Sequence, residues 1–316
     1  MSASEHPEPA AALPGSGPGT VVVLLAYGSP RSEDELRDFL TSVREGVPPR
    51  DREVRYLAAR YEEAEWPAAG VDATEAVRAR LQKTLGVPCA CAFRHAHPRM
   101  AETVARLEDD GVTDALVTTL VPLPGHFSSD AYAQLLAQAL TEADVPLECR
   151  FVHGWWQDER LTGALGRSLK ETLANVIDER PEVIFTAHSL PLDGLPDDDP
   201  YVPAYEEMAA RVAAAAGLQE GGWSLSYQSA PIPAGWLQPS IGQAMAEAAA
   251  GGAGTVVVMP LGFLFDNLEV TWGLDVEARE FASQLGLGYL RVPLLNDDPA
   301  LVETLAGFLA PHLAAT

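Results

Sequence analysis

From Thr20 onward, short apolar runs alternate with longer stretches in which apolar residues recur every three or four positions. The short runs are typical of buried strands, and the longer stretches are typical of helices that cover a sheet. The alternation therefore predicts an α/β fold with mostly parallel sheets. Strands are predicted at Val21–Ala26, Pro88–Phe93, Ala115–Val121, Leu147–Val152, Val183–Ala187, Trp223–Gln228, Thr255–Pro260 and Gly288–Val292.

Helices are predicted in the segments between these strands. The first opens at Ser32, because Glu35 follows three residues later at the spacing of a capping box, and Leu36 and Phe39 then recur at helical spacing. Further helices fit Pro98–Asp109, Asp158–Val176, Pro203–Ala215, Ile241–Ala249 and Val276–Leu285.

The two halves of the chain resemble each other. Val22–Pro30 parallels Val183–Pro191, and Leu116–Leu123 parallels Thr255–Gly262, with a polar residue at the same place after each apolar strand. We therefore expect two similar α/β domains, residues 20–150 and 151–316, that face each other across a cleft. Tyr27 would then be the equivalent of His188 on the opposite side.

Composition narrows the class of protein. A length of 316 residues suits two domains, and a net charge of −24 argues against nucleic acid and anionic membranes as partners. No run approaches the roughly 18 apolar residues of a transmembrane helix.

Residues 1–19 are rich in Pro, Gly, Ala and Ser without Lys or Arg, which predicts a flexible tail rather than a targeting signal. Three cysteines, Cys89, Cys91 and Cys149, are too few for a disulfide scaffold, so we expect a reduced, cytoplasmic protein. We also expect a monomer.

Two segments that follow buried strands carry candidate chemistry. Thr186–Pro191 reads Thr-Ala-His-Ser-Leu-Pro, and Pro260–Glu269 reads Pro-Leu-Gly-Phe-Leu-Phe-Asp-Asn-Leu-Glu. Residues just past the strand ends of an open parallel sheet line the ligand crevice, so His188 and Glu269 are expected to face one cleft. An imidazole opposite a carboxylate can accept protons, hold a divalent metal, or do both. Taken alone, such a histidine is more often a capping or core residue, and such a glutamate is more often a solvated side chain.

These strings resemble the signature of the ferrochelatases, which insert ferrous iron into a porphyrin. The resemblance covers almost all of residues 20–315. It implies two Rossmann-like halves, each with a four-stranded sheet, and an active cleft between them. It also implies that His188 and Glu269 form the catalytic pair, which takes pyrrole protons or holds the incoming metal.

A second resemblance concerns the subclass. Leu-Ala-Tyr-Gly-Ser-Pro, residues 25–30, is similar to the opening of the coproporphyrin-type ferrochelatases of Gram-positive and related bacteria. It implies that Tyr27 approaches the metal from the face opposite His188, as an axial ligand. Coproporphyrin III is thus the favoured substrate, and protoporphyrin IX is the alternative.

A second tier of residues follows from the same resemblance. Glu277 would continue an acidic track toward solvent, and Ser128 would border the cleft. Trp236 would either contact the porphyrin or pack in the core. Arg44 and Arg60 lie where relatives grip the propionates, although the surrounding segment 31–60 contains seven arginines and seven acids and is no basic patch. The chain departs from the family at Asn267, which replaces a histidine, and at Gly273, which replaces an acid.

Other interpretations stay open at this point. Related chelatases that load cobalt or iron into a sirohydrochlorin share the two-halved architecture but lack these strings. A non-catalytic tetrapyrrole- or haem-binding protein is suggested by Asn267 and Gly273, and an α/β protein for another small ligand is the remaining possibility. No glycine-rich nucleotide motif is present. We expect no permanently bound cofactor and no iron–sulfur cluster, because the cluster of some relatives needs four cysteines; Fe²⁺ enters as a substrate.

Overall fold

The structure, a computed structural model, describes residues 19–64, 66, 69–177, 180–219, 221–230 and 234–314. It contains two four-stranded sheets, and every strand pair in both is parallel. The first sheet has the order β2-β1-β3-β4 and the second has the order β6-β5-β7-β8. The strands are β1 (Thr20–Ala26), β2 (Cys89–Phe93), β3 (Asp114–Thr119), β4 (Glu148–Phe151), β5 (Glu182–His188), β6 (Trp223–Gln228), β7 (Thr255–Met259) and β8 (Gly288–Arg291).

The strand order is the same in both sheets, with β1 corresponding to β5 and β3 corresponding to β7. This confirms the predicted fold class of two similar parallel α/β halves. Tyr27 directly follows β1 and His188 ends β5, so both stand at the carboxyl edge of the central strand pair of their own sheet. Of the predicted tail 1–19, all but Gly19 lies outside the described residues. The boundary at residue 150 stays a prediction.

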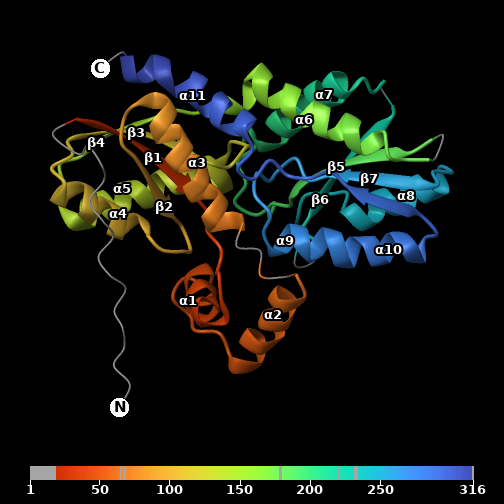
Figure 1. Cartoon of the computed structure of the whole chain (residues 1–316). Helices are drawn as coiled ribbons and strands as arrows, with labels where there is room; N and C mark the ends of the chain where they lie inside the picture. Colours follow the sequence, from red (N-terminus) through yellow and green to blue (C-terminus); the bar gives the residue numbers. More distant parts are fainter. Residues whose placement is uncertain are drawn as a thin grey trace.

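Helices connect the strands and cover both faces of each sheet (Figure 1). They are α1 (Glu33–Val43), α2 (Asp51–Glu63), α3 (Ala69–Leu85), α4 (Met100–Asp109), η1 (His126–Asp130), α5 (Ala131–Ala143), η2 (Trp155–Gln157), α6 (Glu159–Leu173), α7 (Tyr201–Ala216), α8 (Ile241–Ala250), α9 (Leu268–Thr271), η3 (Gly273–Ala278), α10 (Arg279–Gln284) and α11 (Pro299–Ala314). The predicted capping box at Ser32 is wrong: the Ser32 side chain makes no cap hydrogen bond, and Glu35 instead accepts from the backbone N–H of Arg31 at 2.9 Å. The guanidinium of Arg31 also binds Glu35 and holds it away from the cap.

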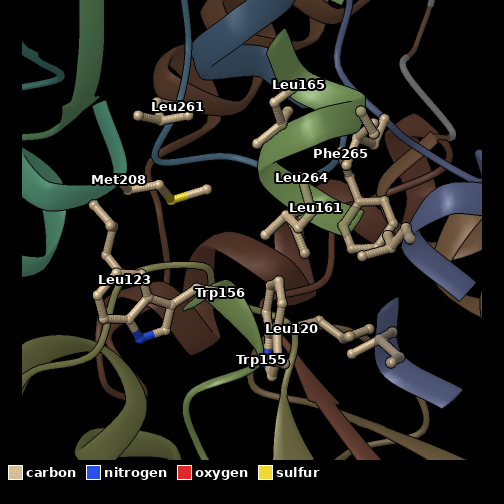
Figure 2. Close-up of a cluster of buried hydrophobic side chains, with 14 of the residues drawn as sticks. Leu120, Leu123, Trp155, Trp156, Leu161, Leu165, Met208, Leu261, Leu264 and Phe265 are labelled. Carbon is tan, nitrogen blue, oxygen red and sulfur yellow. The ribbon is translucent and has the colours of Figure 1, made fainter. Parts of the chain in front are cut away.

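One hydrophobic cluster joins the two halves. It includes Val22 and Phe93 from the first sheet and Phe185 and Val257 from the second, together with residues of α6, α7 and α11. Figure 2 shows part of this cluster, to which Leu120 and Leu123, which follow β3, and Leu261 and Leu264, which follow β7, all belong, with Met208 and Leu161 between them. The loops after these two equivalent strands are therefore held by a shared core, which fixes the spacing between the two carboxyl edges.

The segment of α1 and α2 lies apart from both sheets, below the body in Figure 1. It has a small core of its own, formed by Leu36, Leu40, Val54, Ala58 and Tyr61. Leu268, at the start of α9 in the second half, packs against this core. The α1–α2 segment is thus placed beside α9. In the part of the chain that the structure describes, no helix is both long and apolar enough to cross a bilayer.

Candidate active site

His188 is held at the end of β5 by contacts to its backbone and its ring. Its carbonyl accepts a hydrogen bond from the Tyr201 hydroxyl at 2.8 Å, and its Nδ1–H donates to the Ser189 carbonyl at 2.5 Å. The second contact assigns the proton of a neutral ring to Nδ1, so Nε2 carries the free lone pair. Gly262 packs so closely on this strand end that a Cβ would lie 2.8 Å from Cα of Ala187. The glycine of the Pro-Leu-Gly string is therefore required for packing.

Glu269 lies in the first turn of α9, where Asn267 is the N-cap. The Asn267 side-chain oxygen accepts from the backbone N–H of Glu269 at 2.9 Å and of Val270 at 3.3 Å. Gln228, at the end of β6, donates from its amide to the Glu269 carbonyl at 3.0 Å. Asn267, which departs from the family pattern, thus has a role that suits asparagine well, because Asn is among the best N-caps.

The two side chains meet across the carboxyl edge of the second sheet. His188 Nε2 and Glu269 Oε1 lie 3.5 Å apart, and the side chains are 37% and 41% exposed. Burial favours the neutral imidazole, but the Glu269 charge and hydrogen bonds outweigh it and raise the pKa of His188. Burial likewise favours the neutral acid, but His188 and a hydrogen bond from Ser229 lower the pKa of Glu269. Each partner thus stabilises the charged form of the other.

Tyr27 follows β1 and is 44% exposed. Its ring lies edge-on to His95 at 4.7 Å and to Phe39 at 6.2 Å between centroids. Desolvation, and then the charge of Glu269, raise the pKa of Tyr27 to about 12, while Arg94 opposes them. The negative charge of Glu269 thus acts on the Tyr27 phenol. Gly28 allows the turn that follows Tyr27, because its φ of +84° and the nearness of Ala96 exclude a side chain at this position.

A pocket of about 380 Å³ opens beside Glu269, between α2, the end of β6, α8 and the stretch from α9 to α10. We call it the Glu269 pocket. Its polar lining includes Arg60, Ser229, Glu269 and Glu277. Glu277 is eight residues beyond Glu269, a separation that would rotate it by about 80° around a regular α-helix. The π-turn of η3, in which the N–H of Glu277 donates to the Trp272 carbonyl, absorbs one extra residue and brings both carboxylates to one pocket.

The other predicted residues are placed differently. Trp236 forms a bridge with Pro191 and helps to clamp the loop after His188, and the Ser128 hydroxyl donates to the Leu123 carbonyl at 2.7 Å. Arg44 pairs with Glu53 at 2.9 Å, and Arg60 pairs with Glu277 at the same distance. Of the predicted residues, Glu269, Glu277 and Arg60 line the Glu269 pocket and His188 contacts Glu269. The described lining does not include Tyr27, Ser128, Arg44 or Trp236.

Sequence reasoning gave no role to Ser229 or His95. Ser229 has a positive φ of 65°, which is uncommon for a residue with a side chain, and its hydroxyl holds the Glu269 carboxylate. His95 is buried behind Tyr27 and its Nδ1 lies 3.0 Å from the Ser42 hydroxyl. Neither residue belongs to the two strings that carry the candidate chemistry, so the sequence gives little signal for either.

Comparison with known families decides between the chelatase interpretations. A profile of the ferrochelatase family matches residues 19–313. The chain belongs to the ferrochelatase family. Membership supports a metal chelatase, a lyase that inserts Fe²⁺ into a porphyrin in haem synthesis.

Relatives named ferrochelatase and relatives named coproporphyrin III ferrochelatase both align over most of the chain. The ferrochelatase of Herpetosiphon aurantiacus is 30% identical over 296 residues, which cover 90% of this chain and 96% of the relative. The coproporphyrin III ferrochelatase of Anoxybacillus flavithermus is 28% identical over 308 residues, which cover 92% and 96%. Identities of 28–30% show the family but do not decide which porphyrin is the substrate.

Solved structures agree on the fold. SirB from Bacillus subtilis with Fe³⁺ superposes with a TM-score of 0.57 at 12% identity, covering 94% of this chain and 96% of SirB. DR2241 from Deinococcus radiodurans, described as similar to chelatases with two additional domains, gives a TM-score of 0.56 at 12% identity. The alignment covers 93% of this chain and 55% of DR2241. At such low identity these matches speak for the two-halved chelatase architecture and for nothing finer.

Proposed function

We propose that this ferrochelatase takes coproporphyrin III, inserts Fe²⁺ and releases two protons. The observation that supports this proposal most is the His188–Glu269 pair at 3.5 Å, together with Tyr27 at the end of the equivalent strand β1. A porphyrin between the two sheet edges would present one face to the pair and the other to the phenol.

In the proposed mechanism, the pair works by exchanging protons for the metal. The neutral His188 ring offers its Nε2 lone pair to a pyrrole proton or to Fe²⁺, a borderline metal that accepts nitrogen and oxygen ligands. Glu269 is held in place by Ser229 and by the Asn267 cap. Its negative charge balances the positive charge of the proton or of Fe²⁺. The two porphyrin nitrogens that carry hydrogen lose their N–H bonds as the ring nitrogens bind iron, so two protons leave for each Fe²⁺ that enters.

Glu277 would carry protons or Fe²⁺ between Glu269 and solvent. Its carboxylate is about half exposed and lines the same pocket as Glu269. In the described part of the chain, no group of three or more His, Cys, Asp and Glu side chains is arranged to hold a metal. The proposed route thus consists of a pair and one further acid, which suits a metal that passes through as a substrate.

Tyr27 is the reason to favour coproporphyrin III over protoporphyrin IX. An oxygen ligand at this place would bind the iron of the product from the face opposite His188, as tyrosine does in some haem proteins. Relatives with the coproporphyrin III name stand among those that align at 27–28% identity. The cap formed by Asn267 also weakens the case for a non-catalytic binder, because this replacement supports the position of Glu269.

Metal insertion can be measured directly. The purified protein is incubated without oxygen with Fe²⁺ and either coproporphyrin III or protoporphyrin IX, and the loss of the free-base spectrum is followed. Faster loss with coproporphyrin III, as a ratio of kcat/KM, supports the proposal. A preference for protoporphyrin IX contradicts the subclass, and binding of both porphyrins without any insertion contradicts the catalytic function.

A further inference from the structure

Arg60 makes a contact that the other arginines of the α1–α2 segment do not make. Its guanidinium binds the Glu277 carboxylate at 2.9 Å and thereby joins the last turn of α2 to η3 of the second half. Arg31, Arg37 and Arg44 pair instead with acids of the α1–α2 segment itself. Among the described ion pairs of these four arginines, only that of Arg60 reaches the Glu269 pocket.

Two aromatic rings hold the guanidinium at this place. Its Cζ lies 4.4 Å from the centroid of Tyr56 on α2 and 5.1 Å from that of Trp272, which lines the pocket. The Arg60 side chain is 26% exposed, whereas Glu277 is 53% exposed. Arginine stacks well on aromatic faces and keeps its charge at any working pH. The cation is therefore fixed, while its carboxylate partner is open to solvent and to competing cations.

The Arg60–Glu277 ion pair changes the charge that an entering cation meets in the pocket. Glu269 and Glu277 are the acids among the described lining residues, and Arg60 is the sole cation. Gly273 supplies no further carboxylate, and a Cβ at this position would meet nothing within 4 Å. A divalent cation that approaches Glu269 through this pocket thus meets one acid that is already neutralised by a guanidinium.

We propose that Arg60 is a positioning residue that competes with Fe²⁺ for the Glu277 carboxylate. By pairing with Glu277, it slows the entry of Fe²⁺ into the Glu269 pocket. This inference rests on the proposed route of the metal through Glu269 and Glu277. A half-exposed ion pair adds little to stability, so it opens readily when a cation or a substrate carboxylate replaces one partner. A propionate that takes Arg60 would release Glu277 at the moment when the porphyrin is in place, which makes metal uptake depend on porphyrin binding.

The test measures cation binding without turnover. Co²⁺ is titrated calorimetrically into the wild type, Arg60→Met and the matched control Arg37→Met, which removes an arginine of the same segment from an ion pair outside the pocket. Methionine keeps an apolar chain against Tyr56 and Trp272 but removes the charge. Arg60→Met should bind Co²⁺ about fivefold more tightly or better at low salt, since a positive charge next to the site is gone. Arg37→Met should stay within about twofold of the wild type, because exposed charges are screened.

Two further variants make the result specific. Arg60→Lys keeps the charge and should bind Co²⁺ as weakly as the wild type. In the Glu277→Gln background, Arg60→Met should give a much smaller gain, because the contested carboxylate is absent and only the repulsion between Arg60 and the cation is removed. The proposal is overturned if Arg60→Met binds no more tightly than Arg37→Met, if Arg60→Lys shows the same gain, or if the full gain survives in Glu277→Gln. Should Arg60→Met fail to fold, Arg60→Gln takes its place in every arm.

Metal insertion supplies an independent readout. In Arg60→Met the KM for Fe²⁺ should fall by a similar factor, while the KM for porphyrin does not fall. An unchanged KM for Fe²⁺ contradicts the inference even where insertion itself works. If the wild type inserts no metal into any porphyrin, the proposed function fails, and the Co²⁺ titration still judges the role of Arg60.

Discussion

The Nε2 atom of His188, at the end of β5, lies 3.5 Å from the Oε1 atom of Glu269, in the first turn of α9. Each side chain shifts the pKa of the other toward the charged form, against the effect of burial. The pair is therefore coupled, and a change at one residue is expected to appear in the titration of the other.

Glu269→Gln should lower the pKa of His188. The amide keeps the size of the side chain but removes the negative charge that, after burial, has the largest effect on His188. A histidine whose pKa falls is neutral at lower pH than in the wild type, and this is visible by NMR titration of the imidazole. A pKa that stays the same would show that Glu269 does not control the charge of His188.

The same Glu269→Gln protein should have nearly lost metal insertion, by about 10²-fold or more, as expected for a residue that accepts protons. Glu277→Gln serves as the comparison, because it removes the other carboxylate of the pocket. If Glu277→Gln is inactive while Glu269→Gln inserts iron normally, the two acids have been assigned to each other's roles.

His188→Ala should abolish insertion and leave porphyrin binding largely intact. The ring donates to the Ser189 carbonyl but is 37% exposed, so its loss removes a proton acceptor without emptying a core position. A loss of about 10²–10⁴-fold in kcat is expected. Porphyrin affinity is measured by fluorescence quenching and folding by circular dichroism. Insertion at nearly the wild-type rate in a folded variant would remove the central claim.

The sequence could predict the fold and the pair because both depend on local patterns. Eight apolar runs matched the eight strands to within two residues at each end, and the repeated strand-end strings placed His188 correctly. The helix predicted at Val276–Leu285 shows that such patterns can miss where a helix begins. It begins eight residues earlier, at Leu268, because the Asn267 cap starts α9 and the π-turn of η3 then continues it. A wide turn leaves no periodic signal, since it breaks the regular spacing on which such predictions rest.

The partners of the arginines could not be predicted for a different reason. The segment 31–60 contains as many acids as arginines, and composition does not say which carboxylate each guanidinium selects. Arg60 finds Glu277 across 217 positions of sequence, and Arg37 finds Asp51 across the turn between α1 and α2. The Arg60–Glu277 pair depends on the packing of α2 beside α9, through Leu268. Local sequence patterns do not encode this tertiary contact.

His95 predicts a pH dependence of stability. Burial, then Arg94 and Arg99, lower its pKa from 6.5 to about 4 in the folded protein. Between these values the unfolded chain binds a proton that the folded protein does not, so stability falls as the pH falls from about 6.5 to about 4. The expected loss between pH 7 and pH 5 is about 1–2 kcal/mol in the free energy of unfolding. Urea unfolding of the wild type and of His95→Gln at both pH values measures it. An equal pH dependence in the two proteins would exclude His95 as the cause.

Tyr27→Phe separates the two porphyrin assignments. The change removes only the phenol oxygen, and the ring keeps its contacts with His95 and Phe39, so folding should be little affected. The phenol has a pKa raised to about 12, so it is protonated in the resting protein, and a bound iron would have to displace that proton. We therefore expect the product complex of the variant to show an altered haem absorption spectrum, with turnover changed far less than in His188→Ala. A product spectrum identical to that of the wild type would mean that Tyr27 is not an iron ligand. The preference for coproporphyrin III would then lose the residue on which it rests, and protoporphyrin IX would become an equal candidate.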